Sequence, residues 1–67
     1  MPTIQLNGEA REVPDEWTVA DLLEDLGINN RYCAVEQNQY VVPREEHHER
    51  FLQEGDNIEI VTLVGGG

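Results

Sequence analysis

The hydrophobic and polar positions at the start of the chain alternate in the way that a half-buried β-strand requires. Thr3–Leu6 places an apolar residue at every second position. Asn7-Gly8 follows, a pair typical of a type I′ turn because both central residues of that turn need a positive φ. Residues 9–13 then continue as a second strand. We therefore predict a β-hairpin at the N-terminus.

The next segment has the period of an amphipathic helix. Its apolar residues fall at i, i+3, i+4 and i+7, on one helical face: Val19, Leu22, Leu23 and Leu26. Thr18 is a suitable N-cap, and Asp21 stands three residues later, as in a capping box with Asp in place of Glu. Gly27 supplies the positive φ that commonly ends a helix. The spacing predicts a helix over residues 18–26, with Trp17 packed against its start.

Two short apolar runs follow the helix. Residues 33–36 are typical of a short buried strand, and residues 40–42 of another. The polar residues 37–39 between them favour a turn. Pro43 ends the second run because proline cannot donate a hydrogen bond to a neighbouring strand.

The rest of the chain leads to one more strand. Residues 44–50 are charged, and we expect at most one helical turn there. Phe51 and Leu52 are expected to return to the core. A tight turn over residues 53–56 then introduces the last strand, at residues 57–63.

This order of elements, β-β-α-β-β-β, predicts an α+β fold of the β-grasp, or ubiquitin-like, type. A mixed sheet of four to five strands should pack on one main helix. The first and last strands should lie parallel at its centre, because residues 14–56 are long enough for the crossover that a parallel pair needs. We expect a single domain over residues 1–64 and a flexible glycine tail over residues 65–67.

The last strand should carry a docking patch on its outer face. Ile58 and Ile60 alternate with Glu59, Val61 and Leu63. If the two isoleucines face the helix, the other three face outwards. An exposed apolar patch on a very acidic chain is a candidate docking site. The alternative is an irregular strand whose outer side chains are covered by a loop.

Composition limits the classes of function. The 67 residues allow one small domain, which suits a carrier, adaptor or subunit better than an enzyme. Acidic residues outnumber basic ones by 14 to 4, a net charge of −10, and every cation is an arginine. Nucleic acids and anionic membranes are therefore disfavoured as partners, whereas a basic protein surface would be attracted. The charge could also serve only to keep the chain soluble.

Cellular location follows from what the sequence lacks. The one cysteine, Cys33, cannot form an intramolecular disulfide. No apolar run reaches the roughly 18 residues of a membrane span, and the N-terminus does not resemble a signal peptide. We expect a cytoplasmic protein that is monomeric when free.

The glycine tail is the sharpest chemical feature. From Val64 through Gly65 and Gly66 to Gly67, an extended chain spans roughly 13 Å. It has almost no side chains, so it is thin enough to thread into the active site of another protein. The carboxylate of Gly67 could be adenylated and then converted to a thiocarboxylate by a sulfur nucleophile. The chain has no phosphate-binding glycine loop and no lysine, so we expect ATP and Mg²⁺ to belong to a partner enzyme, and no cofactor on this chain.

Other reactive side chains are expected to have ordinary roles. His47 and His48 are adjacent, and the side chains of adjacent residues rarely point at the same metal ion. We therefore expect structural or surface roles for both, in a solvated segment. Cys33 should be an unreactive thiol of the core. Arg44 should pair with an acidic neighbour or with a partner.

Several motifs together resemble the ThiS family of sulfur carriers in thiamine biosynthesis, over essentially the whole chain. They are Asn7-Gly8, Thr18-Val19-Ala20-Asp21-Leu22-Leu23, Val42-Pro43-Arg44, Gly55-Asp56-Asn57-Ile58-Glu59-Ile60-Val61 and Val64-Gly65-Gly66-Gly67. Each motif alone is weak, and the combination is fairly specific. Gly66 and Gly67 match the diglycine end of the family, and Gly65 matches its longer three-glycine ending.

The resemblance implies a reaction sequence and partners. An E1-like adenylyltransferase of the ThiF type would activate Gly67, and a persulfide from a sulfur donor such as a cysteine desulfurase would supply sulfur. The thiocarboxylate would then donate sulfur to a thiazole synthase of the ThiG type. Two alternatives stay open: a carrier for molybdopterin or another sulfur-requiring pathway, and a ubiquitin-like interaction module that does not use its tail.

Overall fold

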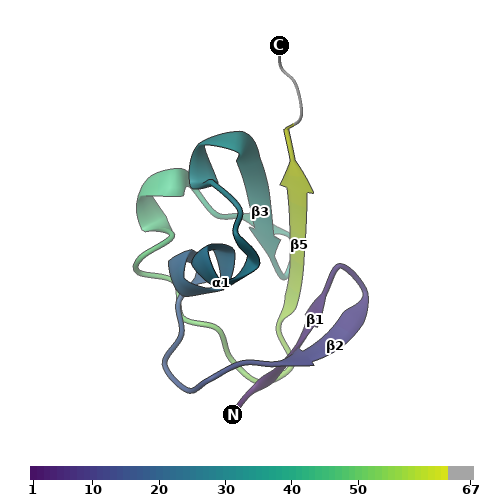
Figure 1. The fold of residues 1–67 in the computed structure, drawn as a ribbon. Coiled ribbons are helices and arrows are strands. Elements are labelled where there is room, and N and C mark those ends of the chain that lie inside the picture. The colour runs from purple at the N-terminus through teal and green to yellow at the C-terminus, as the bar shows by residue number, and fades with distance from the viewer. Residues whose placement is uncertain (64–67) are drawn as a thin grey trace.

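The computed structural model describes residues 1–63, in which a five-stranded mixed sheet carries one α-helix on one face (Figure 1). In chain order, the strands and helices are β1 (Thr3–Leu6), β2 (Glu9–Glu12), α1 (Val19–Leu26), the 3₁₀ turn η1 (Asn30–Tyr32), β3 (Cys33–Gln37), β4 (Tyr40–Val41), the 3₁₀ turn η2 (Arg44–Glu46) and β5 (Asn57–Thr62). The predicted strands and the helix are all present, with ends that differ by at most one residue. The N-terminus and the end of β5 lie at opposite ends of the molecule (Figure 1).

The sheet has the order β2-β1-β5-β3-β4, which confirms the predicted β-grasp fold. β1 and β5 pair in parallel at Gln5↔Asn57 and Leu6↔Ile58. β3 pairs antiparallel with β5 from Cys33↔Thr62 to Gln37↔Ile58. The last strand is therefore central, and it joins the hairpin β1–β2 to the hairpin β3–β4.

Both hairpins turn on residues with a positive φ. Asn7 and Gly8 have φ values of 49° and 87°, as a type I′ turn requires. Asn38 and Gln39, which connect β3 to β4, have φ values of 53° and 72°. Asparagine tolerates this region better than most residues, whereas a glutamine there is less common.

Helix α1 begins and ends as the sequence predicts. The Asp21 backbone N–H donates to Thr18 Oγ1 at 3.3 Å, and the Thr18 backbone N–H donates to Asp21 Oδ2 at 2.9 Å, which completes a capping box. Gly27 ends the helix in the left-handed conformation, with φ 74°. Trp17 packs against the core next to the cap.

The core lies between α1 and the face of the sheet that it covers. Its buried side chains are Ile4, Val13, Val19, Leu22, Leu23, Val35, Leu52, Ile58 and Ile60. The expectation that Phe51 also enters the core is wrong, because its side chain is 53% exposed. The Leu52 backbone N–H donates to the Trp17 carbonyl at 2.8 Å, and Phe51 forms an extended bridge with Thr18. Successive side chains of an extended segment point to opposite sides, so the burial of Leu52 turns Phe51 outwards.

Two further expectations are corrected. The segment over residues 33–36 is only partly buried: Val35 is in the core, whereas Ala34 is exposed on the outer face. The segment 44–50 is not solvated throughout, because the His47 side chain is only 2% exposed. Helix α1 and the two 3₁₀ turns, the helices of the described residues, are all too short to cross a membrane.

Candidate functional site

The outer face of β5 carries the side chains that the sequence singled out for docking. Ile58 and Ile60 are buried against the core, and the residues between and after them are exposed. The exposed fraction is 60% for Val61 and 58% for Leu63, and Glu59 is exposed as well. No loop of the described chain covers them, so the alternative of a covered strand is wrong. Their role in docking stays a prediction, and Val64, Gly65, Gly66 and Gly67 lie outside the described residues.

Strand β3 adds apolar residues beside the end of β5. Ala34 is the direct partner of Val61 in the sheet, and it is exposed on the same outer face. The Leu63 backbone N–H donates to the Tyr32 carbonyl at 2.6 Å, so these two residues extend the pairing beyond β5. Tyr32 is 59% exposed. We name Tyr32, Ala34, Val61 and Leu63 the exit patch, because the chain leaves the sheet there.

Sequence reasoning missed Tyr32 and Ala34. Their place beside β5 depends on the register of β3 on β5, which no local pattern in the sequence determines. The one available signal was the alternation of β3 itself: Val35 is buried, so its neighbour Ala34 had to face outwards.

A pair of glutamates borders the exit patch. Glu36 and Glu59 are direct cross-strand partners on the outer face. Glu36 is two residues after Ala34 on β3, and Glu59 is two residues before Val61 on β5. Like charges directly opposite each other destabilise a sheet. Neither carboxylate forms an ion pair with a cation of residues 1–63. This side of the exit patch thus carries two carboxylates that no cation of residues 1–63 neutralises.

Cys33 lies near the same end of the sheet but faces the core side, opposite Thr62. Its side chain is half-buried and packs against the core, and burial raises the pKa of its thiol. A raised pKa keeps the thiol protonated and lowers its nucleophilicity at neutral pH. This geometry agrees with the expectation of an unreactive thiol.

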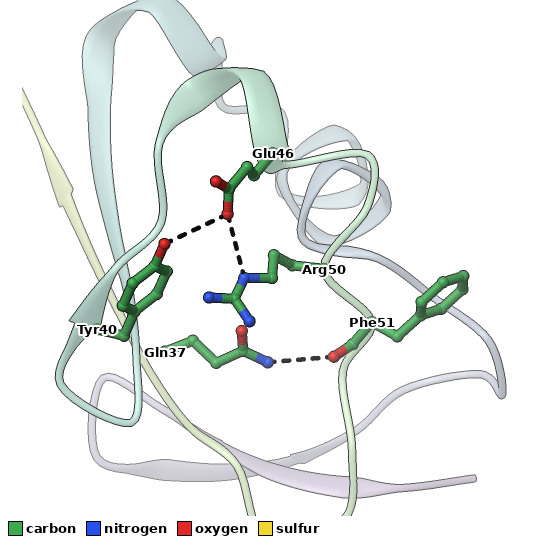
Figure 2. A network of polar contacts seen from close by, with 5 residues as sticks. All are labelled: Gln37, Tyr40, Glu46, Arg50 and Phe51. Atoms are coloured by element: carbon green, nitrogen blue, oxygen red, sulfur yellow. Dashed lines mark hydrogen bonds and ion pairs between the residues drawn. The ribbon is translucent and has the colours of Figure 1, made fainter.

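A cavity of about 390 Å³ opens at the other end of the sheet, between the β3–β4 hairpin and residues 49–56. Figure 2 shows the polar groups around it. The Arg50 guanidinium lies 4.2 Å from the centre of the Tyr40 ring, and Arg50 Nε lies 3.5 Å from Glu46 Oε1. Gln37 Nε2 donates to the Phe51 carbonyl at 3.1 Å. Arg50 Nε is buried and has the Glu46 ion pair but no hydrogen bond within residues 1–63. We interpret the network as a brace between β4 and the segment that follows η2.

Groups that could bind a metal ion are not brought together. Within residues 1–63, no set of three or more His, Cys, Asp or Glu side chains is placed to hold a metal. His47 is buried, whereas the adjacent His48 is exposed. Arg44 is exposed and forms no ion pair with a carboxylate of the described residues, so the expected pairing with an acidic neighbour is not observed. Glu46 pairs with Arg50 instead.

The chain has full-length relatives. The model of the ThiS family matches residues 4–67. The sulfur carrier protein ThiS of Bacillus subtilis is 40% identical over 65 residues, which cover 96% of this chain and 98% of that protein. A crystal structure of the thiamine biosynthesis protein ThiS from Geobacter metallireducens superposes with a TM-score of 0.82 at 29% identity, and the match covers 97% of this chain and 99% of that one.

A longer protein contains a similar segment. The thiazole synthase of Paramagnetospirillum magneticum is 40% identical over 62 residues, which cover 92% of this chain. This chain spans only 19% of the length of that synthase. The similarity therefore concerns one part of the longer protein, of the size of the β-grasp domain described above.

Proposed function

Because this chain belongs to the ThiS family, we propose that it is a sulfur carrier of thiamine biosynthesis whose working group is the carboxylate of Gly67. The observation that carries the proposal is the match to sulfur carriers along the whole chain, including the glycine ending. The fold supports it, since the last strand is central in the sheet and the exit patch lies where that strand leaves it.

The chemistry proceeds in three steps on partner proteins. A carboxylate oxygen of Gly67 attacks the α-phosphate of ATP, and pyrophosphate leaves, which gives an acyl-adenylate. The terminal sulfur of a persulfide then attacks the acyl carbon, and AMP leaves. A second thiol cleaves the resulting acyl disulfide, is itself oxidised to a disulfide with the donor sulfur, and releases the thiocarboxylate.

We assign each of these catalytic tasks to partners, so the chain itself is a carrier and not an enzyme. An E1-like adenylyltransferase holds ATP and Mg²⁺, and a cysteine desulfurase is the source of the persulfide. The reducing cytoplasm suits this sulfur chemistry and a carrier whose one thiol is not oxidised. The acidic outer face, with Glu36 and Glu59 beside the exit patch, favours a basic docking surface on the adenylyltransferase.

A thiazole synthase is the proposed acceptor of the sulfur. The support comes from the synthase of P. magneticum, which contains a segment similar to this chain. Joining two proteins in one chain raises their effective concentration for each other, which is useful when they act in succession. We propose that the separate chain meets its synthase through the exit patch and delivers Gly67 to the synthase active site.

The proposal is tested by intact mass spectrometry. The chain is incubated with the adenylyltransferase, ATP, Mg²⁺, a cysteine desulfurase, cysteine and a thiol reductant. We expect a mass gain equal to the replacement of one oxygen by one sulfur, located on Gly67 by fragmentation. The matched control is the chain without Gly66 and Gly67, which should not gain mass although its described fold is intact.

Two results would contradict the proposal. The absence of a mass gain, with partners that convert the B. subtilis carrier in parallel, would exclude a sulfur carrier and leave an interaction module. A thiocarboxylate that forms but does not support thiazole formation by the synthase would point to molybdopterin or another sulfur-requiring pathway.

A further inference from the structure

The first hairpin holds β5 through a side chain as well as through its main chain. Parallel pairing of β1 with β5 reaches Asn7, whose backbone N–H donates to the Ile58 carbonyl at 2.9 Å. The chain then turns away from β5 at Asn7, where φ is 49°. The next rung of a regular ladder would join Ile60 to the main chain of the first strand. Here the side chain of Asn7 takes that place.

The asparagine amide satisfies both main-chain groups of Ile60 on that side. The Ile60 backbone N–H donates to Asn7 Oδ1 at 2.8 Å, and Asn7 Nδ2 donates to the Ile60 carbonyl at 3.3 Å. Only a few residue types adopt a positive φ readily, chiefly glycine, asparagine and aspartate. Among them only asparagine carries both a donor and an acceptor at neutral pH. Asparagine thus suits this position for two independent reasons: it tolerates the positive φ, and its side chain both donates and accepts a hydrogen bond.

Ile60 is the last point at which β5 is held from both sides. Beyond it, the pairing of the described residues is with β3 and Tyr32 alone, through Cys33↔Thr62 and the bond from the Leu63 N–H to the Tyr32 carbonyl. Val61 and Leu63 of the exit patch come directly after this point. A strand held on one side twists and frays more readily than one held on both.

We propose that Asn7 is a positioning residue for the exit patch: its amide fixes β5 at Ile60 and so sets the direction in which Val61 and Leu63 face a partner. The proposal extends the carrier function proposed above and relies on it for the identity of the partner. Asn7 lies far along the sequence from the patch, and it acts through Ile60 rather than by contact with the partner.

The second hairpin provides a matched control. Asn38 also begins a two-residue turn, with φ 53°, and it also makes two side-chain hydrogen bonds. Asn38 Oδ1 accepts from the Asn57 backbone N–H at 2.9 Å, and Asn38 Nδ2 donates to Asp56 Oδ1 at 3.0 Å. These bonds hold the start of β5, at the end far from the exit patch. Asn38→Gly and Asn7→Gly therefore delete similar interactions, and both retain the positive φ.

The test compares the two glycine variants in hydrogen exchange and in adenylation kinetics. In Asn7→Gly, we expect the protection of the Ile60 amide to fall by about tenfold relative to the core amides, with a smaller loss at Val61 to Leu63. The KM of the adenylyltransferase for the carrier should rise about three- to tenfold with kcat unchanged, because only docking is weakened. Asn38→Gly should leave both quantities unchanged at a similar loss of stability. Asn7→Asp keeps the acceptor for the Ile60 N–H and should restore part of the protection.

The outcomes separate this proposal from the carrier function. If Asn38→Gly raises KM as much as Asn7→Gly does, Asn7 contributes only to stability and the proposal is wrong. It is also wrong if the Ile60 amide keeps its protection in Asn7→Gly. A wild-type chain that is not adenylated at all refutes the carrier function instead, and the exchange pattern at residues 60–63 then decides by itself whether Asn7 fixes the end of β5.

Discussion

Burial of His47 should make the stability of the fold depend on pH below neutrality. The imidazole is 2% exposed, and its Nδ1 is buried without a hydrogen-bond partner in residues 1–63. Burial lowers the pKa of His47 below its ordinary value of 6.5, against a weaker opposing effect of its hydrogen bond to the backbone of Val42. Nearby charges contribute less: His48 and Arg44 lower the pKa, and Glu45 raises it.

The sign follows from proton uptake. Unfolding exposes the imidazole, whose pKa returns to about 6.5, so the unfolded chain binds more protons than the folded one below that pH. The stability that neutral His47 contributes is therefore fully present above pH 6.5. It is lost as the pH falls from 6.5 towards the lower pKa of His47 in the folded chain. One proton per molecule limits the slope to about 1.4 kcal/mol per pH unit. A fall of one unit within the window thus removes a noticeable share of the stability of so small a domain.

Urea unfolding at pH values from about 7 to 5 measures this slope, with tryptophan fluorescence of Trp17 as the signal. The wild-type chain should lose stability towards the acidic end. His47→Gln should be less stable at neutral pH but nearly independent of pH across the window. His48→Gln, which changes the adjacent exposed histidine, should keep the wild-type slope. The reasoning is refuted if His47→Gln retains that slope, since the proton would then bind elsewhere.

Three further predictions concern the cap and the outer face. Thr18→Ala removes the hydroxyl of the capping box and should lower the free energy of unfolding, measured by urea titration, by about 1 kcal/mol. An unchanged free energy of unfolding would mean that Asp21 alone caps the helix. Glu59→Gln should stabilise the free chain by roughly 0.2–1 kcal/mol, because it relieves repulsion by Glu36. The same change should weaken binding to the adenylyltransferase, measured by calorimetry. Tighter binding would contradict a basic docking surface on that enzyme. Val61→Asp should raise the Kd for the same enzyme at least tenfold. Val41 is an equally exposed valine on the edge strand, and Val41→Asp should raise the Kd less. Equal effects of the two changes would show that the exit patch is not the contact surface.

Local patterns in the sequence were sufficient for the turns and the helix. Asn7-Gly8 requires positive φ at two successive positions, and the Thr18–Asp21 pair with Gly27 defines both ends of α1, so these features depend on neighbouring residues alone. The β-grasp fold followed from their order and from the crossover length. The outward direction of Glu59, Val61 and Leu63 followed from the burial of the isoleucines between them.

The errors concern contacts between distant parts of the chain. Phe51 is as apolar as Leu52, and only the bond from Leu52 to the Trp17 carbonyl decides which of the two side chains is buried. His47 occurs in a run of charged residues, and its burial depends on the packing of η2 against the start of α1, where the Ala20 N–H donates to the His47 carbonyl at 2.9 Å. The exit patch likewise needed the register of β3 on β5, which a period-two pattern leaves free.

The central position of β5 has a consequence for the synthesis of the protein. Because the two hairpins pair with each other only through β5, a nascent chain that has not yet released residues 57–62 from the ribosome has two separate hairpins and no shared sheet. Isolated two-stranded hairpins are at best marginally stable in water. We therefore expect prematurely terminated chains without this strand to stay unfolded and open to proteolysis. The cell obtains a folded carrier only after translation has passed the strand that leads to the glycine tail.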